Sequence, residues 1–242
     1  MKISYGITVY CENEDLKKML NLLISTIDAE DEIIILSDSE HVTNEILETI
    51  NSYIEHSPQI RHISYPINKN FSQFKNKLLD HATGDYIFSV GCDELPNVEL
   101  VKDIKQIISS NPHNDSFLFA RANKLIATPE EIKKFHEWHL HSEERIKEIE
   151  DMAANLSTHP DWQSVVWKLN QHPRLEFTNL IHHVLINTKN PLHVSPENGK
   201  YILNHHTPYS KWVHNLEFFN SIEPFGYSGS VENDILIKKG II

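Results

Sequence analysis

A turn, a short apolar run and an acidic pair follow one another in Thr83-Gly84-Asp85-Tyr86-Ile87-Phe88-Ser89-Val90-Gly91-Cys92-Asp93-Glu94. The aromatic and β-branched residues in this run predict a strand that is buried within a parallel sheet. The carboxylates of Asp93 and Glu94 would then lie at the carboxyl end of the strand, where open α/β sheets bind their ligands. The same pair could equally form an ordinary solvated turn, so the residues alone leave both interpretations open.

Strand and helix patterns alternate on both sides of this stretch over residues 1–110, which is typical of a parallel α/β sheet. We expect strands at 3–10, 32–36, 61–67 and 86–90, and helices at 14–27, 42–54, 71–81 and 98–108. The helix at 71–81 is expected to begin after Asn70 and to end at Thr83-Gly84, where glycine can terminate it. Right-handed crossovers would bring the polar strand ends at 10–14, 37–40, 68–70 and 91–94 to one edge of the sheet.

The rest of the chain reads as part of the same domain. Residues 117–125 predict a further strand, and the charged segment 128–156, which follows it, predicts a helical insertion. We therefore expect one domain over 1–242, with a nucleotide-binding half at 1–110 and an acceptor-side half at 157–242.

Composition excludes several classes of protein. The net charge of −12, from 34 acidic and 22 basic residues, disfavours broad binding to nucleic acid. No apolar run approaches the roughly 18 residues of a membrane span, and no signal peptide is apparent. The two cysteines, Cys11 and Cys92, form no disulfide framework, and both are expected near neighbouring strand ends as reduced thiols. A cytoplasmic protein is the simplest expectation.

Several motifs, taken in order, resemble family 2 inverting glycosyltransferases. Residues 83–94 are similar to the strand that leads into the DxD region of that family, and residues 10–14 resemble its opening Asn-Glu segment. Ser37-Asp38-Ser39 resembles the segment whose aspartate recognises the base, and residues 70–76 resemble the Ala-Arg-Asn helix start. His159-Pro160-Asp161-Trp162-Gln163 looks like a Pro-Asp-Tyr-Gln motif of a branch that includes lipopolysaccharide-core transferases and phage homologues.

The resemblance implies a GT-A fold, a Rossmann-like and mostly parallel sheet, here with a helical insertion and a C-terminal extension. It also implies Mn²⁺ or Mg²⁺ and a nucleotide-diphosphate sugar as donor, with UDP-sugars favoured. The donor pocket would include Tyr10, Glu12, Asp38, Lys75, Cys92 and Asp93. The metal ligands would be Asp93 with His205 or His206, with Glu94 as a weaker candidate, and the acceptor would meet Trp162, Gln163 and His182.

Asp161 is the predicted general base, because an inverting transfer needs a group that takes the proton of the acceptor. A second interpretation makes Asp161 the N-cap of a helix over 162–169. Any one histidine or tryptophan of this chain could also be a surface or core residue without a role in the site.

The chain departs from the family pattern at four positions. Gly91 replaces the first aspartate of DxD, Lys75 replaces an arginine, Val165 stands where an arginine is expected, and His183 replaces a glutamate. A nucleotidyltransferase is a weaker alternative, since the first βα turn lacks glycine and lysine. A catalytically degenerate nucleotide-sugar-binding module is a third. The acceptor could be a saccharide, a lipid-linked saccharide or a modified nucleobase, and a homo-oligomer is possible.

Overall fold

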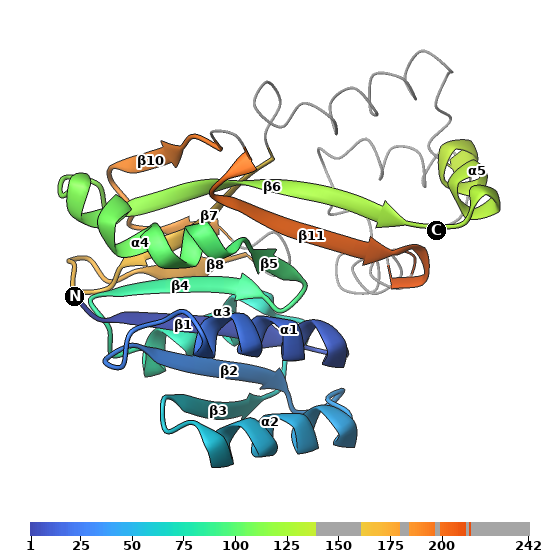
Figure 1. Ribbon diagram of the computed structural model, residues 1–242, viewed down its shortest axis with the longest axis horizontal. Helices are drawn as coiled ribbons and strands as arrows, with labels where there is room; N and C mark the ends of the chain where they lie inside the picture. The colour runs from blue at the N-terminus through green and yellow to red at the C-terminus, as the bar shows by residue number, and fades with distance from the viewer. Residues whose placement is uncertain (139–160, 180–183, 197–198, 212, 214–242) are drawn as a thin grey trace.

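The computed structural model describes residues 1–138, 161–179, 184–196, 199–211 and 213. Its main sheet has nine strands, eight of them in the order β3-β2-β1-β4-β7-β6-β11-β5, and the ninth, β10, pairs with β6 (Figure 1). The α/β class predicted from the alternating pattern is therefore confirmed.

One half of the sheet is parallel. Its strands are β1 (Ile3–Val9), β2 (Glu32–Asp38), β3 (Ile60–Tyr65) and β4 (Tyr86–Gly91), and the helices that join them are α1 (Asn13–Ile24), α2 (Asn44–His56) and α3 (Phe71–His81). Every residue of β2 and all of β1 except Thr8 are buried. Burial on both faces explains why these strands read as continuous apolar runs in the sequence.

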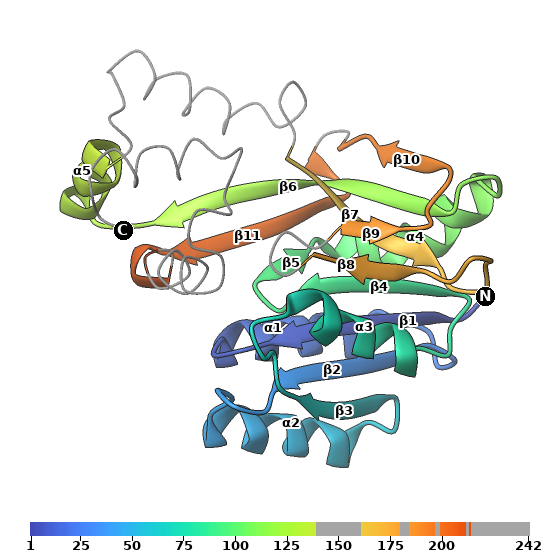
Figure 2. The ribbon, with the colours of Figure 1, turned by 180° about the vertical axis from the view of Figure 1, so that it is seen from behind.

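Two hydrophobic cores cover the two faces of the sheet. On one face, α1, α2 and α4 (Val98–Ser110) pack residues such as Leu20, Ile50 and Ile104 against β1 and β2. On the other face, α3 lies beside β8 (Glu176–Thr178), as Figure 2 shows. There Phe74 and Leu78 of α3 pack in a core that includes Phe177 of β8. The sheet is thus the middle layer, and only its ends are left for chemistry.

The remaining elements extend the sheet and build a small second one. They are β5 (Glu94–Pro96), β6 (Ser116–Ile126), α5 (Pro129–Trp138), β7 (Asp161–Lys168), β8 (Glu176–Thr178), β9 (Val184–Ile186), β10 (Pro191–Val194) and β11 (Ile202–Pro208). β10 and β11 pair with successive parts of β6, and β8 pairs with β9 alone. Helix α5 falls within the predicted insertion at 128–156, whose residues 139–156 lie outside the described part. None of the described helices has the length and apolarity to cross a membrane.

Strand β7 runs antiparallel between β4 and β6, with Phe88 opposite Val166 and Arg121 opposite Asp161. The interpretation of Asp161 as the N-cap of a helix is therefore wrong, because Asp161 is the first residue of a strand. Since β7 runs against β4, its first residues lie at the edge where the parallel strands end. An antiparallel strand thus adds side chains to the ligand-binding edge.

The turn before β4 also differs from its prediction. Helix α3 has the predicted bounds of 71–81, and Asn70 caps it, since its side chain accepts a hydrogen bond from the backbone N–H of Gln73; its C-cap is Ala82, so glycine does not terminate the helix. A Cβ atom at Gly84 would lie 2.8 Å from the backbone nitrogen of Ser4 and 2.9 Å from the carbonyl oxygen of Lys2. Glycine is needed at this position because the chain passes close to β1.

Candidate active site at the carboxyl edge of the sheet

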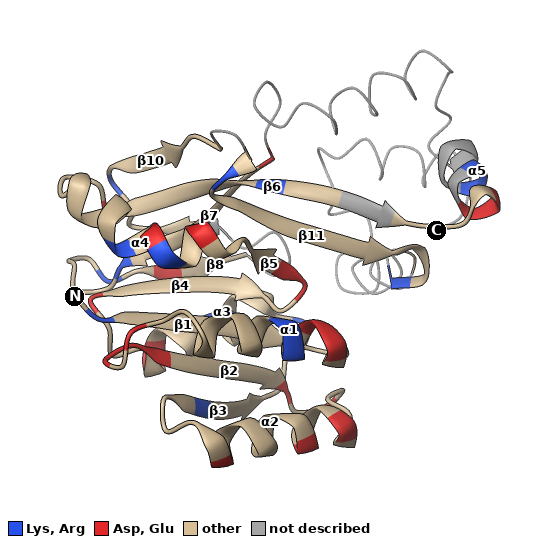
Figure 3. Cartoon of the chain, in the orientation of Figure 1, with Lys and Arg blue, Asp and Glu red and all other residues tan. Residues whose placement is uncertain are grey.

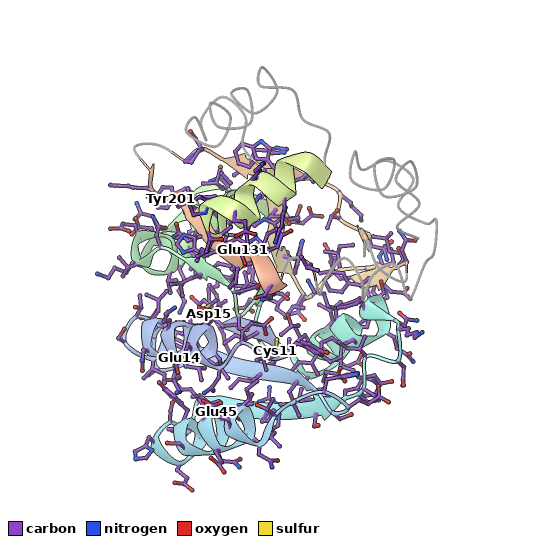
Figure 4. The ribbon with its side chains drawn as sticks, turned by 90° about the vertical axis from the view of Figure 1, so that its right-hand side faces the viewer. Cys11, Glu14, Asp15, Glu45, Glu131 and Tyr201 are labelled. Carbon is purple, nitrogen blue, oxygen red and sulfur yellow. The ribbon has the colours of Figure 1, made fainter. Side chains whose placement is uncertain are left out.

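Most of the predicted site residues lie at the edge where β1, β2 and β4 end, which is on the right in Figure 1. Figure 4 looks onto this edge, with the labelled Cys11 near its centre, and the colouring of Figure 3 marks acidic residues in red at the start of α1 and α2 on the same side. Two backbone contacts hold the ends of β1 and β4 together: Thr8 is opposite Gly91, and the Cys92 N–H donates to the Thr8 carbonyl at 3.0 Å.

Asp38 is fully buried at the end of β2. Its Oδ1 accepts from the backbone N–H groups of Glu40 and Ile67, both at 3.2 Å, and its Oδ2 lies 2.5 Å from Nδ1 of His41. The Tyr10 ring lies against the His41 ring, with centroids 5.4 Å apart. Asp38 therefore fixes the loop after β2 and, through His41, an aromatic pair that a planar base could stack upon.

Glu12 closes the turn between β1 and α1. Its Oε2 accepts from the N–H groups of Tyr10 and Cys11, at 3.1 and 3.0 Å, while its Oε1 lies 2.5 Å from Nζ of Lys211. Burial acts to raise the pKa of Glu12, but the attraction of the Lys211 ammonium is stronger than this effect, so the pKa of Glu12 is lowered. The neighbouring Cys92 is buried, which raises the pKa of its thiol and keeps it protonated.

Asp93 lies at the mouth of the site and is not turned into the interior, since 18% of its side chain is exposed. Its Oδ2 is 2.7 Å from Nζ of Lys211 and 3.3 Å from Nε2 of His205. Burial acts to raise the pKa of Asp93, but His205 and Lys211 together hold it well below its usual range. Asp93 is thus a carboxylate at all physiological pH values.

His205 is oriented by neighbouring strands. Its Nδ1 lies 2.8 Å from Oδ1 of Asn123 on β6, and its Nε2 lies 3.1 Å from the hydroxyl of Thr207. Side chains alternate between the two faces of a strand, so the exposed His206 points away from Asp93. Of the two predicted histidines, the structure brings only His205 to Asp93.

Asp161 belongs to a second cluster beside Asp93. Its Oδ2 accepts from Nε of Arg121 at 2.9 Å and from Nδ2 of Asn123 at 2.7 Å, and it lies 2.8 Å from Nη2 of Arg121 in an ion pair. Its Oδ1 accepts from Nε2 of Gln163 at 2.7 Å. Arg121 also donates to Glu94 at 2.6 Å. Burial would raise the pKa of Asp161, but Arg121 and the other donors lower it, so Asp161 is ionised at neutral pH.

The arginine that is absent at position 165 has a counterpart on the next strand. Val165 is buried in the core, whereas Arg121 of β6 stands opposite Asp161 and binds it. Sequence reasoning missed Arg121, Asn123 and Lys211, because each reaches the site from a strand or segment distant in sequence. Arg121 carried no local signal of this role, since the predicted strand at 117–125 also holds the polar Asn123 and the charged Lys124.

Three further predicted residues, Lys75, Trp162 and His182, differ in where they lie relative to Asp93 and Asp161. Nζ of Lys75 lies 5.6 Å from the centre of the Phe177 ring, and burial lowers the pKa of Lys75 although Glu94 and Asp93 oppose this. Trp162 follows Asp161 and therefore lies on the opposite face of β7, edge-on to the His193 ring with centroids 4.8 Å apart. His182 lies outside the described residues.

Comparison with protein families matches residues 4–161 to glycosyl transferase family 2. The match spans well over half of the 242 residues and includes every site residue of β1, β2, β4 and β6. The chain belongs to glycosyl transferase family 2. Its mostly parallel sheet with an inserted antiparallel strand is the GT-A arrangement that the resemblance implied.

Solved structures of S. aureus TarS are similar to this family 2 protein over 53% of its length. TarS 1–349 has 20% identity and a TM-score of 0.42, and 37% of that chain is covered. TarS has 21% identity and a TM-score of 0.42, and 22% of that chain is covered. TarS 1–349 in complex with UDP-GlcNAc has 20% identity and a TM-score of 0.43, and 36% of that chain is covered. The family 2 chain therefore spans well under half of each of these proteins. A comparison with curated protein sequences found no match.

The donor set at Asp93 does not fit the divalent ion expected for a family 2 protein. The Lys211 ammonium already occupies Oδ2 of Asp93, and Gly91 supplies no second carboxylate. Within the described ranges, the only three acidic, histidine or cysteine side chains with mutually close ligand atoms are Asp38, Glu40 and His41. These lie at the end of β2. With Lys211 in place, a divalent ion at Asp93 would face a positive charge and find one carboxylate already engaged.

Proposed function

We propose that the protein transfers a sugar from a nucleotide-diphosphate sugar to a hydroxyl acceptor, with inversion at the anomeric carbon. One observation carries this proposal: a family 2 sheet gathers Asp38, Asp93 and Asp161 at one edge, together with the cations Lys211 and Arg121. Carboxylates alone would repel a diphosphate, so the interleaved cations are what suit the edge to an anionic donor.

The nucleoside would bind at the end of β2. There Tyr10 and His41 offer stacking surfaces, and the buried Asp38 holds the loop that surrounds them. We favour a UDP-sugar, and the donors GDP-sugar and dTDP-sugar are the alternatives for the test below. The diphosphate would extend from this pocket towards Asp93, where Lys211 and Lys75 contribute positive charge.

Asp161 would act as the general base through Oδ1. Of its two oxygens, Oδ2 receives two hydrogen bonds and an ion-pair contact with Nη2 of Arg121, whereas Oδ1 receives only the one hydrogen bond from Gln163 among the described residues. Oδ1 therefore has acceptor capacity left for the acceptor hydroxyl. The acceptor oxygen bonds to the anomeric carbon, its proton passes to Asp161, and the bond to the diphosphate oxygen breaks to release the nucleotide diphosphate.

Replacement of the base tests this mechanism. Asp161→Asn should lower turnover by about 10² to 10⁴-fold and leave nucleotide binding within about twofold, because a general base contributes on that scale. The measurement is nucleotide release from a panel of UDP-, GDP- and dTDP-sugars, with the product anomer read by NMR. Asp80→Asn, which breaks the exposed ion pair with Arg174, is the matched control.

The outcomes separate the functions that the sequence left open. If Asp161→Asn keeps full turnover, the base is another group. If the wild-type protein binds nucleotide diphosphates but releases none from any donor, the degenerate binding module is correct. A retained anomeric configuration would refute inversion.

The finer features stay proposals. The acceptor could be a saccharide, a lipid-linked saccharide or a modified nucleobase, and the resemblance to lipopolysaccharide-core and phage enzymes is one guide to it. Two free cysteines are consistent with the reducing cytoplasm that we propose as its location. Binding of Mn²⁺ or Mg²⁺ by Asp93 and His205 is tested together with the inference below.

A further inference from the structure

Lys211 reaches the site from the segment after β11, far along the chain from the other charged residues of the edge. Its Nζ lies 2.5 Å from Oε1 of Glu12 and 2.7 Å from Oδ2 of Asp93, and only 14% of its side chain is exposed. These two carboxylates come from the ends of β1 and β4. The ammonium therefore joins the two adjacent strand ends that form the centre of the edge.

The Lys211 ammonium lies beside Asp93, the carboxylate that the family resemblance assigns to the metal ion. A cation that serves the diphosphate must touch Asp93, and the ammonium makes this contact on the oxygen that also faces His205. An ammonium has three N–H donors, and Glu12 and Asp93 use two of them. Among the described residues the third has no partner, so it can donate to a phosphate oxygen. Because both carboxylates compensate its charge, Lys211 stays protonated, and they raise its pKa against the effect of burial.

The glycine at position 91 is consistent with this arrangement. A Cβ atom at Gly91 would lie 2.6 Å from Oδ1 of Asp93, so a side chain there is incompatible with the present position of the Asp93 carboxylate. An aspartate at 91 would also add a third negative charge next to Glu12 and Asp93. One ammonium can bridge two carboxylates, whereas three carboxylates require a cation of higher charge.

We propose that Lys211 is the built-in cation that meets the diphosphate of the donor, in place of a divalent ion at Asp93. This inference rests on the proposed function, because it assigns the charge that stabilises the same leaving group. It explains why the chain lacks the first aspartate of DxD while the rest of the edge keeps its carboxylates.

The first experiment measures binding of UDP, GDP and dTDP by calorimetry, with EDTA or with Mn²⁺. The wild-type protein should bind one of these nucleotides equally well in both conditions. In EDTA, Lys211→Met should weaken binding by about 10- to 100-fold, the effect of one charge-assisted hydrogen bond. Lys17→Met, which removes an exposed ion pair with Glu14 on α1, should leave it unchanged.

The second experiment measures Mn²⁺ itself by electron paramagnetic resonance, without nucleotide. Wild-type protein should show no specific Mn²⁺ site at Asp93, whereas Lys211→Met should gain one, because Glu12 and Asp93 are released. Lys211→Arg keeps the positive charge between Glu12 and Asp93 and should gain no Mn²⁺ site. If Lys211→Met does not fold, the metal dependence of nucleotide binding by the wild-type protein still decides, because binding in EDTA shows that no divalent ion is needed.

Two results would overturn the inference in distinguishable ways. If wild-type protein binds nucleotide only with Mn²⁺, Lys211 is not the cation, and the proposed transferase function stands with Asp93 and His205 as metal ligands. If no nucleotide diphosphate binds in either condition, the proposed function fails and the inference fails with it.

Discussion

At Asp161, four donor atoms from three side chains surround one carboxylate: two from Arg121 and one each from Asn123 and Gln163. Such a carboxylate is well positioned and ionised, but it is a weak base, because each donor favours the charged form. In the proposed mechanism Arg121 is a positioning residue that holds the pKa of Asp161 down. Its guanidinium also binds Glu94, so it fixes the two acidic side chains relative to each other.

Arg121→Gln should therefore shift the pH profile of turnover. Loss of the positive charge raises the pKa of Asp161, so the base is ionised only at higher pH, and the acidic limb of kcat/KM should move up by about one pH unit. The measurement is kcat/KM against pH for wild type, Arg121→Gln and the control Arg174→Gln, whose guanidinium pairs with Asp80. An acidic limb at the same pH in all three would argue against Asp161 as the base.

At the scale of the elements, the site depends on how closely β4 and β1 approach one another. The turn before β4 passes over Ser4, whose hydroxyl accepts a hydrogen bond from the Gly84 N–H at 2.9 Å. This contact sets the register that places Gly91 opposite Thr8 and so puts Asp93 beside Glu12. A local constraint at one end of the pair thus decides which side chains meet at the other end.

Gly84→Ala should lower the free energy of unfolding by about 1–3 kcal/mol, because the new methyl group would lie 2.8 Å from rigid backbone atoms. Gly6→Ala in β1 is the matched control. Its Cβ would meet the ends of the buried Leu78 and Ile87 side chains, at 3.2 and 3.3 Å, which is a milder contact than one with backbone atoms at 2.8 Å. Urea denaturation measures both, and equal losses of stability would refute the importance of the close approach.

At the scale of the whole molecule, Glu32 links four parts of the parallel sheet. Its carboxylate accepts from the Ser4 hydroxyl at 2.6 Å, from the backbone N–H and the hydroxyl of Thr83 at 2.7 and 2.8 Å, and from Arg61 at 2.7 Å. Burial would raise the pKa of Glu32, but these partners lower it to about 2. The amino ends of the strands are thus held together by a buried ion, opposite to the edge that carries the site.

This lowered pKa makes stability depend on pH. A carboxyl with a lower pKa in the folded state stabilises fully above its unfolded value of 4.5, and this contribution is lost as the pH falls towards 2. Glu32→Gln should cost about 2 kcal/mol of unfolding free energy at pH 7, and the difference from wild type should shrink at acidic pH. Thermal or urea unfolding at several pH values checks this, with Glu48→Gln on the exposed face of α2 as control. A pH-independent difference would contradict it.

Local patterns were enough to predict the fold class. The apolar runs and amphipathic helices of residues 1–110 predicted the four parallel strands, and their polar ends predicted which edge carries the site. Family motifs then placed Asp38, Asp93 and Asp161 at that edge, and the structure brings Asp93 to His205 and Asp161 to Gln163. These features follow from short-range periodicity, because side-chain burial repeats within a few residues along a strand or helix.

Tertiary structure alone decided which charges meet. The sequence allowed Asp161 to be the N-cap of a helix. Asp161 instead begins strand β7, because residues 161–168 pair with β4 and β6. Arg121 and Lys211 carried no local signal of their roles, since their partners lie 40 residues away at Asp161 and 118 residues away at Asp93. Contacts at such separations depend on strand order and register, because the strength of an ion pair is set by distance and burial in space and not by proximity along the chain.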